Sequence, residues 1–168
     1  RFLSQAFPIK AGVILISKST GELIDEKHYH GAYGYRDPAI TIESTAQDID
    51  NLRLSGESLT LEFKEKFTSG EDIAKAAVSF ANTRGGQIVI GIAEDGRIVG
   101  ISGDKIHDRV ENILRSHCDP PLKAKIDVLQ LDGKPIAAIT ISEGADKPYN
   151  VHDHGIYIRS GATSRIAT

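Results

Sequence analysis

A half-buried strand is the sequence feature that most limits what this chain can fold into. From Leu59 to Lys64, apolar side chains alternate with polar ones along the segment LTLEFK. Successive side chains on a strand point to opposite faces, so this period of two predicts a strand with one face in the core. The same period places Glu62 and Lys64 together on the opposite, polar face.

The segment after this strand predicts a helix and then a more apolar strand. Ser69 can act as the N-cap of the helix. Apolar side chains then recur at the spacing of one helix face, at Ile73, Ala76, Ala77 and Phe80. The run QIVIGI from residue 87 to 92 predicts a buried strand. Asp95-Gly96 predicts a hairpin turn before a returning strand over residues 97–101.

The remainder of the chain predicts another helix and three strands. Ile106, Val110, Ile113 and Leu114 share one helix face, and Pro120-Pro121 stops that helix. Strands are expected over residues 126–131, 136–141 and 155–159. The element order is therefore β-α-β-β-α-β-β-β, which predicts an α+β sandwich.

The first fifty residues have a different pattern. Two segments, 11–17 and 22–30, flank a turn-like stretch and predict an N-terminal β-hairpin, after which glycines, tyrosines and a proline interrupt the pattern. We expect a boundary near residues 50–56, with a β-rich extension over 1–50 and a domain over 51–168. The chain begins at Arg1 and contains no methionine, so we expect it to be part of a longer protein.

Composition narrows the class of partner only slightly. The formal net charge of -3, without a basic tail, lowers the expectation of nucleic-acid binding but leaves room for a local basic groove. The single cysteine, Cys118, excludes an internal disulfide and favours a cytoplasmic location. No apolar run approaches the roughly 20 residues of a membrane span, so we expect no membrane partner.

Carboxylates around the first strand form a candidate catalytic and metal site. Glu62 and Lys64 share a strand face, Glu57 lies at the strand entrance, and Glu94-Asp95 occupies the predicted hairpin turn. Carboxylate oxygens bind magnesium or manganese, and a lysine can stabilise charge on a phosphoryl oxygen. The alternative is that these acidic residues belong to a solvated surface, as most such residues do.

A second group of residues could contact nucleic acid directly. Arg84 lies in the turn NTRGG, whose glycines let the backbone approach a phosphate, although they can equally form the C-terminal cap of the preceding helix. Cations and aromatic rings that suit phosphate contacts and base stacking gather near the end of the chain. They are Lys147, Tyr149, Tyr157, Arg159 and Arg165. For each tyrosine, packing in the core is the commoner role.

Three segments together resemble the Schlafen AlbA_2 family in order and spacing. They are ESLTLEFK at 57–64, FANTRGG at 80–86 and IGIAEDGRIVG at 90–100. The closing segment YIRSGATSR is similar to that family's terminal strand and arginine-bearing tail, so the resemblance covers nearly everything after Gly56. The family is described as a putative DNA-binding domain and formerly as a divergent ATPase. It occurs in prokaryotic regulators and in animal Schlafens, some of which cleave transfer RNA.

The resemblance implies both a function and a site. In the cleaving members two glutamates and an aspartate form the metal site, and by motif these fall on Glu57, Glu62 and Glu94. Glutamate replaces aspartate at the third position, where Asp95 is the alternative ligand. We expect binding of RNA or DNA within a larger regulatory or defence protein.

Two alternatives remain beside nucleic-acid binding. One is a metal-dependent endoribonuclease that uses Mg²⁺ or Mn²⁺, and the other is an ATP-binding regulatory module, against which the absence of a P-loop counts. Without catalysis no cofactor is expected. Because Schlafen cores resemble two such lobes facing across a groove and this chain carries one, we also expect a homodimer.

Overall fold

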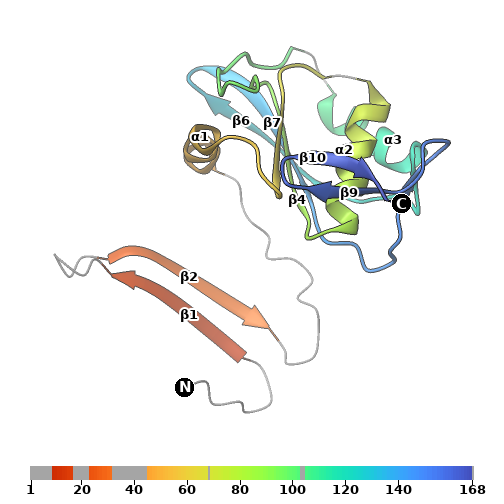
Figure 1. Ribbon diagram of the computed structural model, residues 1–168. Coiled ribbons are helices and arrows are strands. Elements are labelled where there is room, and N and C mark those ends of the chain that lie inside the picture. The colour runs from red at the N-terminus through yellow and green to blue at the C-terminus, as the bar shows by residue number, and fades with distance from the viewer. Residues whose placement is uncertain (1–8, 17–22, 32–44, 68, 103–104, 168) are drawn as a thin grey trace. The chain divides into compact units, whose positions relative to one another are not determined.

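The computed structural model describes residues 9–16, 23–31, 45–67, 69–102 and 105–167, in two compact units (Figure 1). The first unit, Arg1–Ile42, contains the antiparallel hairpin of β1 (Ile9–Ile16) and β2 (Leu23–Gly31). This confirms the predicted N-terminal hairpin at the level of the backbone. The second unit, Glu43–Thr168, holds all the remaining elements.

The second unit begins earlier than the sequence predicts, because residues 46–55 form a helix that belongs to it. In α1 (Ala46–Ser55) the Thr45 hydroxyl accepts a hydrogen bond from the Asp48 amide at 3.1 Å. The Asp48 carboxylate in turn accepts one from the Thr45 amide at 3.0 Å, which completes a capping box. Ile49 is fully buried in the core of this unit. The predicted boundary near residues 50–56 therefore falls in the second half of a packed helix and at its C-cap.

A four-stranded sheet forms the centre of the second unit. Its strand order is β3 (Leu61–Lys64), β4 (Gly86–Ile90), β7 (Lys134–Ile141) and β6 (Lys125–Leu131). β3 and β4 are parallel, whereas β7 is antiparallel to both of its neighbours. The carboxyl ends of β3 and β4 therefore lie at the same edge of the sheet.

Helices cover both faces of this sheet, and the fold class is α+β as predicted. On one face, α2 (Gly70–Asn82) and α3 (Ile106–Ser116) pack against apolar residues that include Ile88 and Ile90. On the other face, Ile49 of α1 packs with Leu61 and Phe63. The alternation seen in the sequence of β3 is thus confirmed, because its apolar side chains enter one core while Glu62 and Lys64 point away from it.

The helix predicted after β3 also forms as expected. The Ser69 hydroxyl accepts a hydrogen bond from the Asp72 amide at 3.2 Å, so Ser69 is the N-cap of α2. The helix ends where the glycine turn begins, and the Gly85 amide donates to the Phe80 carbonyl at 2.8 Å. The glycines of the turn therefore terminate a helix, which is the structural alternative given above.

The rest of the unit differs from the prediction in two places. The predicted strand over residues 97–101 is wrong, because this segment forms only an isolated bridge between Ile92 and Ile98. Instead the amides of Val99 and Gly100 both donate to the carbonyl of Gly91. Because two consecutive amides share one acceptor, the regular hydrogen bonding of a β-ladder does not continue here. At the end of the chain, β9 (Tyr157–Ser160) continues into an additional strand, β10 (Thr163–Ile166), to form a C-terminal hairpin beside α2 (Figure 1).

The single cysteine lies in a short strand at the edge of the α2 and α3 core. β5 (Cys118–Asp119) pairs with β8 (Asn150–Val151), and the Cys118 side chain is buried. Burial raises the pKa of this thiol from its ordinary value of 9.0 to about 12, because the thiolate cannot be solvated there. None of the helices in the described part of the chain is long and apolar enough to span a membrane.

We expect Cys118 to be unreactive toward the thiol reagent DTNB in the folded protein at neutral pH, since the reagent requires an accessible thiolate. Unfolding in urea should make the thiol react at once, and absorbance of the released thionitrobenzoate measures both rates. Because the pKa is raised in the folded state, stability is also expected to fall as the pH rises from about 9 toward 12. Equally fast labelling with and without urea would contradict the burial of this side chain.

Candidate functional site

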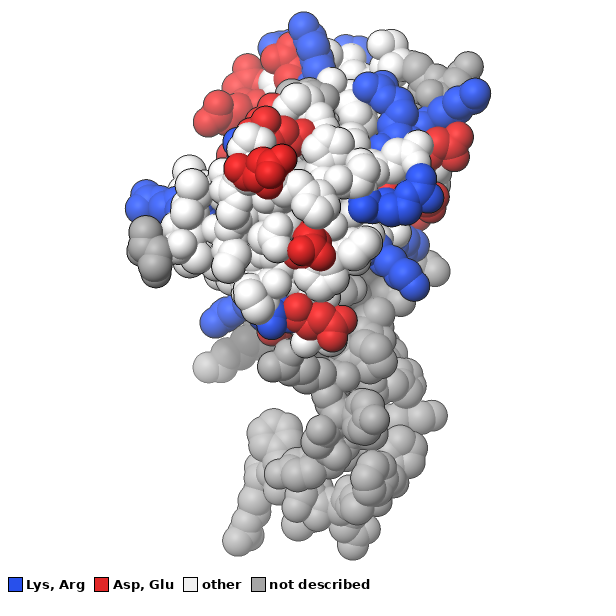
Figure 2. Space-filling model, turned by 90° about the vertical axis from the view of Figure 1, so that its right-hand side faces the viewer, with Lys and Arg blue, Asp and Glu red and all other residues white. Residues whose placement is uncertain are grey.

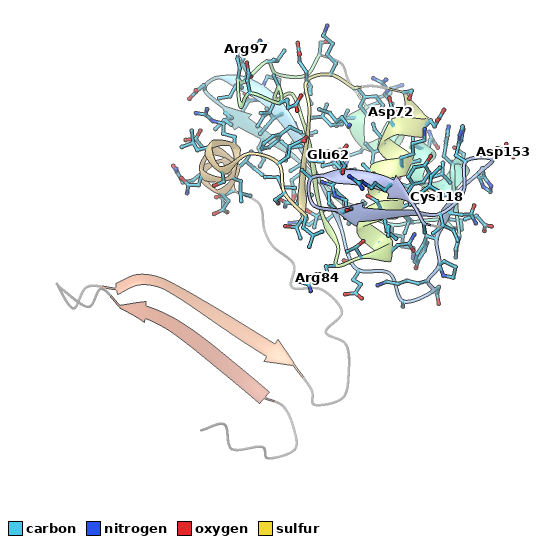
Figure 3. The ribbon with its side chains drawn as sticks, in the orientation of Figure 1. Glu62, Asp72, Arg84, Arg97, Cys118 and Asp153 are labelled. Carbon is cyan, nitrogen blue, oxygen red and sulfur yellow. The ribbon has the colours of Figure 1, made fainter. Side chains whose placement is uncertain are left out.

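Four of the residues predicted to be catalytic line one cavity of about 350 Å³. They are Glu57, Glu62, Lys64 and Glu94. The walls are completed by Asp72, Lys75 and Ala76 of α2 and by residues 162–164 of the C-terminal hairpin. Figure 3 shows Glu62 in the middle of the domain, between Arg97 at one end and Arg84 at the other. We call this the acidic cavity.

The parallel pairing of β3 and β4 explains why these residues meet. Glu62 and Lys64 lie on β3, and Glu94 follows the end of β4 at the same sheet edge. Glu57 precedes β3 and folds back along it, so that its carboxylate accepts a hydrogen bond from the Phe63 amide at 2.8 Å. Glu57 therefore fixes the approach to the strand as well as lining the cavity.

Glu62 is a nearly buried carboxylate whose two oxygens are both bound to cations. The residue is 8% exposed. Lys64 Nζ lies 2.6 Å from Oε1, and Arg159 Nη1 donates to Oε2. A buried charge is tolerated only when it is paired and hydrogen-bonded, and these two partners supply that compensation.

Arg159, which the sequence predicts to contact nucleic acid, lies inside the domain. Its side chain is buried, and besides Glu62 it donates from Nη2 to the Ser58 carbonyl at 2.7 Å and from Nη1 to Ser164 Oγ at 3.2 Å. The guanidinium also lies 4.6 Å from the centre of the Phe80 ring. Arg159 thus joins β9 to β3. The guanidinium is enclosed and its Nη1 and Nη2 atoms are already bonded within the protein, so the predicted phosphate contact of Arg159 stays a prediction.

The two predicted base-stacking tyrosines are also part of the core. Tyr149 and Tyr157 are 6% and 9% exposed. Asn82 at the end of α2 holds both segments, since its Nδ2 donates to the carbonyls of Tyr149 and Tyr157 at 2.8 and 2.9 Å. Its Oδ1 accepts from the Tyr149 amide at 2.8 Å. Both tyrosines therefore pack in the core, which is the alternative role that the sequence allowed. Because both residues are buried, neither ring presents a face for base stacking.

The other predicted nucleic-acid contacts are exposed but lie away from the acidic cavity. Arg84 follows α2 at the far end of the domain from Arg97 (Figure 3). Lys147 Nζ donates to the Thr83 carbonyl at 3.1 Å and to Glu143 at 2.7 Å, so it belongs to the same end. Arg165 pairs with Ile158, on the side of the hairpin opposite to Arg159 and Ser164. Figure 2 shows one face of the domain, where acidic and basic side chains are interspersed.

Asp95, the alternative metal ligand, is exposed and does not line the acidic cavity. Its Oδ1 accepts a hydrogen bond from the Arg97 amide at 2.9 Å, which closes the turn after β4. The predicted turn at Asp95-Gly96 is confirmed, because the Gly96 amide donates to the Ala93 carbonyl at 2.8 Å. Asp95 therefore shapes the loop that carries Glu94.

Two residues of α2 that the sequence analysis missed contribute charge to the acidic cavity. Asp72 and Lys75 lie on the polar side of the helix and face the cavity. Lys75 donates to Glu71, and this hydrogen bond raises the pKa of Lys75 and lowers that of Glu71. Lys75 Nζ also lies 5.7 Å from the centre of the Tyr157 ring. Asp72 and Lys75 are three residues apart on α2, so the sequence indicates that they share one face of the helix beside the buried residues. It does not indicate that this face lines a cavity.

The carboxylates of the acidic cavity are not arranged as a metal-binding cluster. Within the described residues no group of three histidine, cysteine, aspartate or glutamate side chains could hold an ion. Both oxygens of Glu62 already bind Lys64 and Arg159, and Glu57 binds a backbone amide. In this arrangement a divalent cation could bind Glu62 only by displacing Lys64 or Arg159.

Comparisons with known proteins place residues 57–168 in a described family, since the family model for Schlafen, AlbA_2 matches them. No curated protein shows a significant match to the chain. Solved structures with a similar fold include the following two. One is the DIP2311 protein from Corynebacterium diphtheriae, with a TM-score of 0.53 and 20% identity, covering 65% of this chain and 22% of that one. This chain therefore spans about a fifth of the length of that protein.

A second similar structure is the N-terminal domain of a putative ATP-dependent DNA helicase RecG-related protein from Nitrosomonas europaea. Its TM-score is 0.54 at 24% identity, with 74% of this chain and 90% of that chain covered. At such identities the two likenesses establish the fold alone. The family match covers the residues that line the acidic cavity, from Glu57 to Ser164.

Proposed function

Since this chain belongs to the Schlafen AlbA_2 family, we propose that its domain binds nucleic acid, with the strand lying across the acidic cavity. The observation that carries the proposal is the convergence of Glu57, Glu62, Lys64 and Glu94 on that one cavity. These residues come from two of the segments that resemble the family. A similar fold in a protein titled as DNA helicase-related adds support for a nucleic-acid partner.

The charge of the acidic cavity indicates which part of the strand it receives. Four carboxylates line it, against the lysines Lys64 and Lys75. Carboxylates repel a phosphate but accept hydrogen bonds from sugar hydroxyls and from the amino groups of bases. The ribose 2′-hydroxyl is such a donor and is absent from DNA, so RNA is favoured over DNA.

A second candidate function is endonucleolytic cleavage of RNA. The specific observation that favours it is that Glu57, Glu62 and Glu94, the positions implied by the family's cleaving members, line the same cavity as Lys64. Lys64 and Arg159 would compete with Mg²⁺ or Mn²⁺ for the oxygens of Glu62. We therefore rank cleavage second to binding. The homodimer predicted from the sequence involves a second copy of the chain. It stays a prediction.

The direct test of the proposal is incubation of the chain with labelled transfer RNA and with duplex DNA, in the presence of manganese or of a chelator. Binding of RNA that persists in chelator, without strand breakage, is the result expected for a binding domain. Manganese-dependent fragments would establish the second candidate instead. The proposal fails if neither nucleic acid binds at moderate salt.

The variant Glu94→Gln is expected to leave RNA affinity unchanged or to raise it. Glu94 is an exposed carboxylate of the acidic cavity, and its removal lowers the repulsion of the phosphate backbone. Glu62→Gln should abolish any metal-dependent cleavage that the wild type shows. Because it also leaves the buried Arg159 without its carboxylate, its folding is checked by thermal unfolding before its affinity is compared. Fluorescence anisotropy with labelled transfer RNA measures the affinity, and gel electrophoresis measures cleavage.

Asp153→Asn is the matched control for these variants, because Asp153 is exposed, lies outside the acidic cavity, and has a φ of 63° that asparagine tolerates. Its affinity for transfer RNA should equal that of the wild type. The glutamine oxygen can still accept a hydrogen bond from a sugar or base. A clear loss of affinity in Glu94→Gln, with the control unchanged, would therefore show that the negative charge of Glu94 favours binding, and would contradict the expected repulsion of the phosphates.

A further inference from the structure

A second cavity, of about 380 Å³, has the opposite charge. Its lining includes Lys66, Gly100, Ser102, Gly133 and Lys134. Of the described residues that line it, the two lysines are the only charged ones. We propose that this basic cavity binds a backbone phosphate of the same nucleic-acid strand that crosses the acidic cavity. The inference rests on the proposed function, and it specifies where the nucleic-acid strand lies on the domain.

The opposite charges of the two cavities match two different parts of a nucleic-acid strand. The acidic cavity has more carboxylates than lysines and repels a phosphate, whereas the basic cavity offers two ammonium groups and no carboxylate in its described lining. A nucleic acid presents neutral sugars and bases beside charged phosphates. A strand that places its sugar and base over the first cavity and a phosphate in the second therefore meets a favourable group in both.

Backbone hydrogen bonds join the segments that line the two cavities. Lys64 lines the acidic cavity and Lys66 lines the basic one, so only residue 65 separates them in the chain. The Gly91 amide donates to the Lys64 carbonyl at 2.8 Å, and the Gly91 carbonyl accepts from the Gly100 amide at 2.9 Å. Gly91 thus joins β3 to the loop that lines the basic cavity. Lys64 and Glu94 of the acidic cavity, and Lys66 and Gly100 of the basic cavity, lie at or just after the carboxyl ends of the parallel strands β3 and β4.

Lys134 is held in position before any ligand arrives. Its Nζ donates to the Ile98 carbonyl at 2.9 Å, which fixes the ammonium group near the loop that ends in Gly100. A Cβ at Gly100 would lie 3.1 Å from the Lys134 Cβ, and the φ of 86° at Gly100 also favours glycine. Glycine therefore leaves room for the lysine. The two remaining hydrogens of the ammonium are available to a phosphate oxygen.

The side chains at this cavity suit a phosphate better than a carboxylate or a metal ion. Lysine is a compact point charge that commonly binds phosphate, whereas a planar carboxylate is better matched by arginine. Lys66 is exposed on the loop after β3 and can move toward an anion held by Lys134. Together the two ammonium groups can neutralise one phosphodiester.

The test compares the double variant Lys66→Gln and Lys134→Gln with the control Lys123→Gln, which removes an exposed lysine that does not line the basic cavity. Fluorescein-labelled transfer RNA is titrated with each protein over a series of potassium chloride concentrations. Losing two exposed ionic contacts should weaken binding about fivefold to tenfold. The slope of log affinity against log salt should become shallower by about 0.7 for one lost phosphate contact on an unpaired strand. The control should match the wild type.

The outcomes separate this inference from the function on which it rests. If wild-type protein binds transfer RNA and the double variant keeps both affinity and salt slope, the phosphate site is wrong and the binding function stands. If wild-type protein binds no nucleic acid, both fail. A third outcome is that wild-type protein binds ATP saturably, that the double variant does not, and that both bind transfer RNA equally well. The basic cavity would then bind a free nucleotide, and the proposal that it holds a backbone phosphate would be wrong.

Folding of the variants is checked independently by their thermal unfolding. Lys66 is exposed on a loop, so the single variant Lys66→Gln should keep the wild-type melting temperature. If loss of the Lys134 contact to Ile98 destabilises the double variant, the salt dependence of Lys66→Gln alone decides the question. A shallower slope in that variant supports the phosphate site, and an unchanged slope overturns it.

Discussion

Arg159→Ala is expected to lower the free energy of unfolding by about 3–5 kcal/mol, because it leaves a buried carboxylate without its enclosed partner. Glu62 would keep only Lys64, which is itself partly exposed. The carbonyl of Ser58 would lose its donor, and space would open beside Phe80. Urea denaturation followed by circular dichroism measures the change.

Arg165→Ala is the matched control, since this arginine lies on the same C-terminal hairpin but is exposed. Its free energy of unfolding should stay within about 0.5 kcal/mol of the wild type. The double variant Arg159→Met and Glu62→Gln should lose less stability than the sum of the two single variants, because it removes the charge together with its partner. A loss in Arg159→Ala as small as that in Arg165→Ala would refute the internal role of Arg159.

Phe80→Ala should also be severely destabilising, by about 3–5 kcal/mol. The ring is fully buried on the face of α2 that packs against the sheet. A Cβ added at Gly86 would lie only 2.5 Å from the Phe80 Cδ1, so the ring fills the space beside the first residue of β4. Its removal leaves a void that the neighbouring backbone cannot close, and it takes away the ring beneath Arg159.

The control for Phe80→Ala is Leu54→Ala on α1, whose side chain is 74% exposed. This variant should unfold at nearly the wild-type temperature in a thermal melt. Phe80→Leu should fall between the two, because it restores part of the lost volume. An unchanged melting temperature in Phe80→Ala would mean that α2 packs through a different face.

Local patterns in the sequence predicted the elements that position the acidic cavity. The period of two in β3 identified Leu61 and Phe63 as core residues and put Glu62 with Lys64 on the other face. The helical spacing after Ser69 identified Phe80 as the end of a buried stripe. Both patterns depend on residues a few positions apart, so the sequence displays them directly.

The burial of Arg159 could not be predicted in the same way. An arginine on a short strand near glycine and serine resembles a surface residue, and its partner Glu62 is 97 positions earlier in the chain. Only the docking of the C-terminal hairpin brings the two together. Tyr149 and Tyr157 were ambiguous for a similar reason, because Asn82 holds both segments from the end of α2.

Weak or misleading local patterns account for the remaining differences. In α1 only Ile49 is buried, while Leu52 and Leu54 are exposed, so the helix lacks a clear apolar stripe. The segment 97–101 alternates like a strand after a turn. It folds instead onto Gly91, where a φ of 101° turns the backbone away from the geometry of a strand.

The distance along the chain between Glu62 and Arg159 also affects how the protein is made. A ribosome synthesises β3 well before β9, with 97 positions between the two residues. Of the two cations that pair with Glu62 among the described residues, Lys64 alone has been synthesised during that interval. We expect nascent chains that stop short of β9 to remain sensitive to protease, and to become resistant when Arg159 leaves the exit tunnel.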